Sequence, residues 1–140
     1  MQLIMTTDYA IRSLLYLSLI DRMAPASEVS ERMNIPKQYL VTMSRKLKDA
    51  GLIAALPGAA GGYYLARDAS EITLLDIMRV TEGTDGINRC TEQGACCERF
   101  SSEDCPVKGV YEELQSTVEE LLSHVTLADL KRRMQARDLP

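Results

Sequence analysis

Two short helices followed directly by a glycine-rich hairpin constrain the fold of this 140-residue chain more than any other feature. The stretch EVSERM is predicted to be helical with Ser27 as its N-cap, and Asn34-Ile35-Pro36 then interrupts the pattern. Pro36 suits a first helical position, because its missing N–H would have no intrahelical acceptor there. The second helix runs to about Ala50 and stops at Gly51, the expected C-terminal glycine. This order is typical of a helix-turn-helix.

A hairpin follows the second helix without a long connection. Leu52–Leu56 and Tyr63–Ala66 are strand candidates, and a glycine-rich turn separates them. A helix-turn-helix followed by such a hairpin is a winged helix. Further helices are predicted over residues 6–20 and 72–82. We therefore expect a mainly α fold with a small β-wing.

The second helix of the motif has one apolar face and one polar, basic face. Leu40, Met43 and Leu47 form the inward stripe, and only one acid, Asp49, accompanies the cations. Gln, Thr and Arg can bond base edges, while lysines can neutralise phosphates. The alternative is the solvated face of an ordinary helix. The predicted DNA-binding residues are Lys37, Gln38, Tyr39, Thr42, Arg45, Lys46 and Lys48 on the helix, with Gly61 and Gly62 in the wing.

The net charge of −4 does not exclude a nucleic-acid partner, because the charge is unevenly spread. Residues 1–81 carry nine basic and eight acidic side chains, whereas residues 82–130 carry three and eleven. No apolar run is long enough to span a bilayer, so a cytoplasmic protein without membrane contact is expected. Thiols stay reduced in that compartment, which favours metal or redox roles for the four cysteines over structural disulfides.

The cysteines lie in the pattern C-x5-C-C-x7-C, formed by Cys90, Cys96, Cys97 and Cys105. The absence of a C-x2-C pair argues against a zinc finger, a zinc ribbon or a thioredoxin-type site. Adjacent side chains usually diverge, so Cys90, one of the central pair and Cys105 are the expected ligands, with a fourth donor elsewhere. The only histidine, His124, is interpreted as a polar surface or interface residue.

A long helix is predicted to begin at Pro106. Its apolar residues follow a 4-3-4-3-4 spacing that favours a dimerisation helix, and the alternative is a helix packed on its own domain. The predicted dimer seam consists of Val107, Tyr111, Leu114, Val118, Leu121 and Val125. The chain then divides into a winged helix-turn-helix domain (1–83), a cysteine-rich loop (84–105) and a dimerisation helix with a C-terminal segment (106–140).

The stretches TTDYAIRSLLYL, IPKQYLVTMSRKLKDAGLI and GAAGGYYLARDASEITLLDIMRVTEG, together with the cysteine loop, resemble the Rrf-type (IscR- and NsrR-like) winged helix-turn-helix regulators. The resemblance covers nearly the whole chain. It implies a homodimeric transcriptional regulator, expected to be a repressor, that binds a palindromic operator in double-stranded DNA. It also implies an iron–sulfur cluster, either [4Fe–4S] or [2Fe–2S], that senses iron, redox state or nitric oxide.

Carried over by position, Cys90, Cys96 and Cys105 match the three cluster cysteines of the family. The last gap is longer than the usual one, so Cys97 competes as the middle ligand. A fourth ligand could be Asp8 of the other subunit, which matches the aspartate that NsrR-like members use. Asp8 could also serve only as a helix-dipole carboxylate, and ligation by all four cysteines is a third possibility.

Two departures from the family pattern keep other functions open. IscR-like members place a histidine ligand where this chain has Lys108, and Pro57 stands where the wing usually has an arginine. Without that wing cation, a phosphate or minor-groove contact is lost. The sequence therefore indicates either a lower affinity for DNA or a different target sequence. One alternative is a cluster-free thiol/disulfide switch, and another is a metal-binding interaction module without DNA binding. An enzyme is not expected, since no nucleophile–base motif is present.

Overall fold

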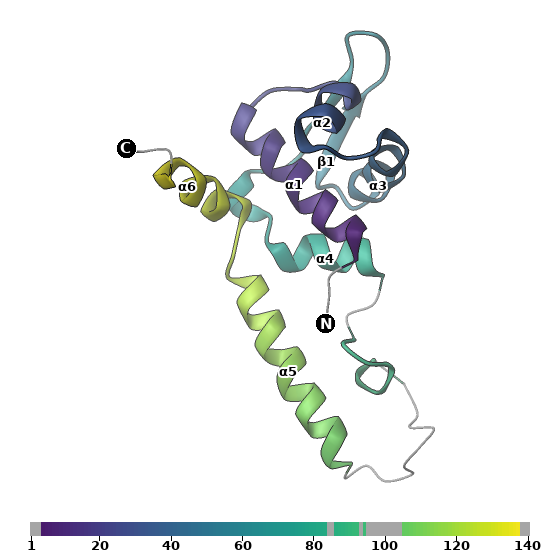
Figure 1. Ribbon diagram of the computed structural model, residues 1–140, viewed down its shortest axis with the longest axis vertical. Coiled ribbons are helices and arrows are strands. Elements are labelled where there is room, and N and C mark those ends of the chain that lie inside the picture. Colours follow the sequence, from purple (N-terminus) through teal and green to yellow (C-terminus); the bar gives the residue numbers. More distant parts are fainter. Residues whose placement is uncertain (1–3, 84–85, 93, 95–104, 138–140) are drawn as a thin grey trace.

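The computed structural model describes residues 4–83, 86–92, 94 and 105–137. The fold is mostly helical with one small antiparallel sheet (Figure 1), which confirms the predicted fold class. None of the described helices is long and apolar enough to cross a membrane. The elements are α1 (Met5–Ile20), α2 (Ala26–Met33), α3 (Lys37–Asp49), β1 (Ile53–Leu56), β2 (Gly62–Leu65), η1 (Ala69–Glu71), α4 (Leu74–Glu82), η2 (Arg89–Thr91), α5 (Pro106–Ser123) and α6 (Leu127–Arg137).

Helix α1 is the centre of the winged-helix domain and packs against α2, α3, α4 and α6. Its buried residues include Ala10, Leu14 and Leu17, which join the α3 side chains Leu40 and Leu47 in one core. The inward stripe predicted for the second helix of the motif is therefore buried as expected. Burial of these aliphatic side chains fixes which face of α3 remains in solvent.

The turn between α2 and α3 is set by backbone geometry and by one serine. Asn34 ends α2 in the left-handed region at φ 53°, and Ile35 is buried. The Ser30 hydroxyl donates to the Ile35 carbonyl at 2.6 Å, while the Ile35 N–H donates to the Ser30 carbonyl at 2.9 Å. Helix α2 begins at Ala26, so Ser27 lies inside its first turn and is not the predicted N-cap. The N-cap position is occupied by Pro25 instead, at φ −60°.

The wing is attached to the body of the domain by a bridge to the α1–α2 linker. Ala24 pairs with Tyr63 through two backbone hydrogen bonds of 2.8 and 2.9 Å. A Cβ added at Gly62 would collide with the Ala24 carbonyl, and one at Gly61 would collide with the Leu56 carbonyl. Close backbone packing therefore requires glycine at both positions.

Helix α5 extends away from the domain, and its C-terminal end leads back into the domain through α6 (Figure 1). The two ends of this excursion meet at a bridge between Thr73 and Thr126. There the Leu74 N–H donates to the Val125 carbonyl at 2.9 Å, and the Leu127 N–H donates to the Ile72 carbonyl at 3.0 Å. The return segment thus lies within the winged-helix core.

The predicted seam extended to Val125, but α5 ends at Ser123 with His124 as its C-cap. Val125 is only 9% exposed and lies in the junction, so it does not extend the seam. Helix α6, which the sequence division places with the dimerisation segment, packs on α1, and Lys131 donates to the Ser18 carbonyl at 2.9 Å.

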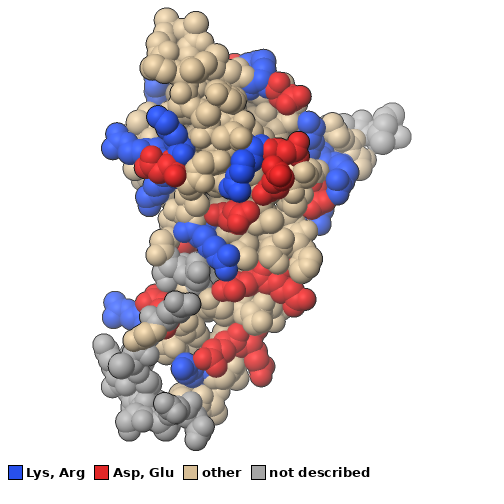
Figure 2. All heavy atoms as spheres, turned by 180° about the vertical axis from the view of Figure 1, so that it is seen from behind, with Lys and Arg blue, Asp and Glu red and all other residues tan. Residues whose placement is uncertain are grey.

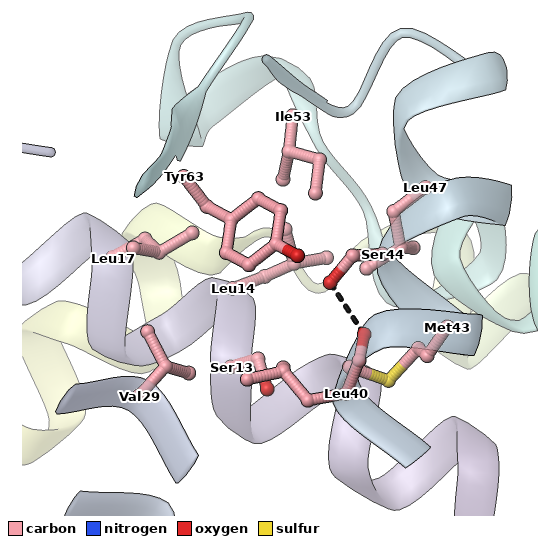
Figure 3. A pocket seen from close by; sticks show the side chains of 10 residues that line it. All are labelled: Ser13, Leu14, Leu17, Val29, Leu40, Met43, Ser44, Leu47, Ile53 and Tyr63. Atoms are coloured by element: carbon pink, nitrogen blue, oxygen red, sulfur yellow. Dashed lines mark hydrogen bonds between the residues drawn. The ribbon is translucent and has the colours of Figure 1, made fainter. Parts of the chain in front are cut away.

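A small internal cavity of about 10 Å³ lies between α1 and α3 beneath the wing (Figure 3). It is lined mostly by aliphatic side chains, with the Tyr63 ring on one side. Ser13 Oγ is buried there and has no hydrogen-bond partner among the described residues. A cavity of this size is at the lower limit for one water, roughly 10–15 Å³. No described residue offsets the cost of removing the Ser13 hydroxyl from bulk water.

Replacing Ser13 by alanine should raise the free energy of unfolding by about 1 kcal/mol, because a buried unpaired hydroxyl is removed. Urea unfolding at fixed protein concentration measures the change. Ser44→Ala is the matched control: it removes a buried hydroxyl that donates to the Leu40 carbonyl at 2.5 Å, and it should not stabilise. A lower stability for Ser13→Ala would mean that the hydroxyl has a partner, such as a buried water.

Candidate nucleic-acid interface and cysteine site

The polar side of α3 is the strongest candidate for a DNA-contacting surface. All seven helix residues predicted to bind DNA are exposed, while the apolar stripe on the other side is buried. Gln38, Thr42, Arg45 and Asp49 share one face, with lysines beside it. The acid at the C-terminal end of this face is the one side chain that would repel phosphate. DNA contact by each of these residues stays a prediction.

The first turn of α3 is held against α1 by an aromatic pair. The Tyr39 and Tyr9 rings lie edge to face, with centroids 6.0 Å apart and an interplanar angle of 67°. The predicted DNA-binding role of Tyr39 thus coincides with a packing role. The prediction also missed Val41, which is 46% exposed on α3. An aliphatic group at such a position can contact a thymine methyl group.

A hydrogen-bonded network fixes α2 relative to α1. The Tyr16 hydroxyl donates to Glu28 Oε1 at 2.6 Å, and Arg22 donates to both Glu28 oxygens, at 2.7 and 3.2 Å. The hydrogen bonds from Arg22 and then Tyr16 lower the pKa of Glu28 below its usual value. This carboxylate therefore stays ionised at neutral pH and keeps both partners. The network sets the position from which α2 supports α3.

The wing carries no charge. No Lys, Arg, Asp or Glu occurs between Asp49 and Arg67, and the end of the molecule formed by the wing shows neither blue nor red atoms in Figure 2. The close backbone packing of Gly61 and Gly62 already explains these glycines. Their predicted DNA contact remains untested. Positive charge available to phosphate near the recognition helix thus comes mainly from α3.

Helix α5 presents an apolar stripe that no described part of the chain covers. Val107, Val110, Leu114 and Leu121 are all exposed, with Val110 at 61% and Leu121 at 64%. The other two predicted seam residues, Tyr111 and Val118, are only half exposed, at one edge of the stripe. The stripe therefore runs through Val110, which the prediction missed because it used a single heptad register.

Two of the four cysteines fall within the described residues. Cys90 lies in η2 and Cys105 is the N-cap of α5; both are free thiols of intermediate burial. Cys96 and Cys97, the alternative middle ligands, lie outside the described residues. In the described ranges, no three His, Cys, Asp or Glu side chains come together as a metal site. Of the predicted cysteine site, the structure therefore places only the first and the last cysteine, Cys90 and Cys105.

The proposed fourth ligand and the histidine both have local partners. Asp8 lies in the first turn of α1, about half exposed, and its Oδ2 accepts a 2.8 Å hydrogen bond from Arg12. That hydrogen bond raises the pKa of Arg12 above its usual value. His124 Nδ1 lies 2.7 Å from the Glu120 carbonyl at the end of α5, consistent with a capping role.

Comparison with known proteins gives the family. The model of the Rrf2 family, described as iron-dependent transcriptional regulators, matches residues 4–133. The chain belongs to the Rrf2 family. It is 31% identical over 134 residues to protein Rrf2 of Nitratidesulfovibrio vulgaris, an alignment that covers 94% of this chain and 88% of that protein.

Two solved structures of Rrf2-type regulators have the same fold. IscR of T. potens gives a TM-score of 0.82 at 25% identity and covers 100% of this chain and 93% of that one. The oxidised form of Staphylococcus aureus CymR gives 0.74 at 26% identity, with 94% and 96% covered. The chain is therefore a winged-helix transcriptional regulator and not an enzyme. Regulators of this family bind DNA and are dimeric.

Lys46→Ala should weaken binding to a short mixed-sequence duplex, because one cation of α3 is removed. The slope of log affinity against log salt should fall by about one for each phosphate that is no longer neutralised, or about two per dimer. Fluorescence anisotropy across a salt series measures both. Arg133→Ala on α6 is the matched control, since it removes an exposed cation remote in sequence from α3. Equal effects of the two variants would contradict the assignment of α3 as the phosphate-binding helix.

Proposed function

We propose that this Rrf2-family regulator acts as a homodimeric repressor whose affinity for a palindromic operator depends on an iron–sulfur cluster. Cys90, Cys105 and either Cys96 or Cys97 supply thiolates, and Asp8 of the partner subunit completes the ligand set. The observation that carries the proposal is the placement of Cys90 and Cys105: both half-buried thiols lie on elements that contact or belong to α5, the helix with the uncovered apolar stripe.

Operator binding in this proposal is the task of α3. Its exposed Gln38, Thr42 and Arg45 can bond base edges in the major groove, and its lysines can neutralise phosphates. A palindrome suits a two-fold dimer, because each recognition helix then meets one half-site. Occupying the operator in this way would block access of the transcription machinery, which supports a repressor.

Dimerisation in this proposal buries the exposed stripe of α5. Four large aliphatic side chains on one helical face, left in water, would form an unfavourable surface. Pairing with a second copy would remove their area from water at roughly 25 cal/mol per Å². The a/d-like spacing supports helix–helix packing between protomers.

The donor set fits an iron–sulfur group in its chemistry. Thiolates are the usual ligands of such clusters, and Cys90 and Cys105 are reduced and unpaired. Asp8 is accessible on α1, and Arg12 binds one of its carboxylate oxygens. When bound, the group would cross-link both ends of the 90–105 segment and would supply redox and ligand-exchange chemistry. Among the described residues, Cys105 is the N-cap of α5, and the Asp8–Arg12 ion pair lies at the first turn of α1.

A cluster-free thiol switch is the second candidate, and one comparison favours it. Staphylococcus aureus CymR, at 26% identity, has been solved in an oxidised form. In that case Cys96 or Cys97 would form a reversible disulfide with Cys105, and the protein would respond to oxidant without metal. A metal-binding module without DNA binding is disfavoured, because the chain belongs to a family of transcriptional regulators.

Anaerobic reconstitution with iron and sulfide tests the cluster directly. We expect a coloured protein with stoichiometric iron and sulfide in the wild type, and loss of both in Cys90→Ala and Cys105→Ala. Cys96→Ala and Cys97→Ala should differ, since only one of the two is a ligand. Asp8→Ala should retain the cluster but lose it faster in air, and Glu31→Ala, which removes an exposed acid on α2, is its control.

A colourless, iron-free wild type after reconstitution would overturn the cluster proposal and leave the thiol switch. Unchanged cluster lifetime in Asp8→Ala would remove the aspartate from the ligand set.

A further inference from the structure

Among the described residues, Gln115 is the α5 side chain that hydrogen-bonds the turn carrying Cys90. The Ile87 N–H donates to Gln115 Oε1 at 2.9 Å, and Thr91 Oγ1 lies 3.0 Å from the same oxygen. These two residues flank Cys90 on either side. The Thr91 hydroxyl also lies 2.8 Å from the Asn88 carbonyl, which closes the turn on itself. One amide oxygen thus accepts the Ile87 N–H and shares the single Thr91 hydroxyl proton with the Asn88 carbonyl.

The orientation of the Gln115 amide is fixed from both ends. The Ile87 N–H can only donate, so the oxygen of the amide must face it. The amide nitrogen in turn donates to Glu119 Oε1 at 2.7 Å, one helical turn further along α5. Glu119 Oε2 lies 3.9 Å from Arg79 Nη2 of α4. The contacts therefore run from the Cys90 turn through α5 to the winged-helix domain.

We infer that Gln115 is the residue that positions Cys90 for metal or redox chemistry. The inference rests on the proposed function, in which the Cys90 sulfur is reactive. Cys105 is placed on α5 by the chain itself, since it is the N-cap of the helix. Cys90 comes from a different element and needs a separate attachment to the same helix. Gln115 provides that attachment.

A single turn of this kind has little conformational stability of its own. Element η2 is one turn of 3-10 helix, and isolated single turns are unstable because nucleation costs more than one hydrogen bond returns. Without the Gln115 oxygen, the Ile87 N–H loses its partner and Thr91 keeps only its contact within the turn. Cys90 then samples more positions, whereas Cys105 keeps its place on α5.

Two variants separate the acceptor role of Gln115 from its size. Gln115→Leu keeps the volume and removes the acceptor. The double variant Gln115→Glu/Glu119→Gln keeps an acceptor facing Ile87 and a donor between the two side chains, and it removes the partly exposed ion pair of Glu119 with Arg79. Ser116→Ala, an exposed neighbour on α5, is the control.

The first measurement uses the reduced, metal-free full chain and needs no cluster. Iodoacetamide labelling followed by peptide mass spectrometry gives the alkylation rates of Cys90 and Cys105 in the same molecules. In Gln115→Leu we expect the Cys90 rate to rise about fivefold, the size expected for one net hydrogen bond, with the Cys105 rate unchanged. The double variant and Ser116→Ala should stay within about twofold of wild type.

An unchanged Cys90 alkylation rate in Gln115→Leu would overturn the inference. An equal rise in the Cys105 rate would also overturn it, because it would indicate general loosening of α5.

The second measurement is the half-life of the cluster absorbance in air after anaerobic reconstitution. It should shorten in Gln115→Leu and recover in the double variant. A wild type that binds no iron would contradict the cluster proposal, while the alkylation rates would still decide the role of Gln115.

Discussion

The backbone bridge between Thr73 and Thr126 is the contact on which the rest of the molecule depends. It closes the excursion that contains the cysteine segment and α5, because backbone hydrogen bonds join the segment at Ile72, just before α4, to the segment at Leu127, just after α5. Both residues are fully buried. Each side of the bridge also starts a helix with the same reciprocal cap, Thr73 with Asp76 and Thr126 with Asp129. The bridge therefore connects the end of α5 to the starts of α4 and α6, and both of these helices pack on α1.

Charge is divided along the molecule in a way that suits a DNA-binding protein of acidic composition. The cations of α3 lie near the wing, whereas α5 extends from the opposite side of the domain (Figure 1) and carries a surplus of glutamate, seen as red atoms in its region of Figure 2. Helix α5 is about 27 Å long. Glu112 and Glu113 lie about 15 Å along its axis from the end at the domain, which is beyond the Debye length of about 8 Å at physiological salt. With a neutral wing, affinity for phosphate depends mainly on α3.

Local rules predicted the winged helix but not its longer-range details. The apolar stripe of α3 and the glycines around the hairpin are short-range signals, and they identified the fold. Val125 was misplaced because a buried apolar residue just beyond a helix keeps the same period as a seam residue, and His124 is not a helix breaker. No local signal could have linked Gln115 to the Cys90 turn, since its partners there lie at least 24 positions away. The spacing of the cysteines named the candidate ligands but not their separation in space.

The central claim is that the state of the cysteine segment changes how the two recognition helices bind DNA. Its most direct test is anaerobic fluorescence anisotropy, at one fixed salt concentration, on a duplex that the wild type has selected from a random library. The reconstituted, metal-free reduced and oxidised forms of one preparation are compared. Coupling between two sites typically amounts to about 5- to 150-fold, so we expect the affinities of at least two forms to differ by fivefold or more. Equal affinities of all three forms would contradict the account, because the cysteines would then have no influence on DNA binding.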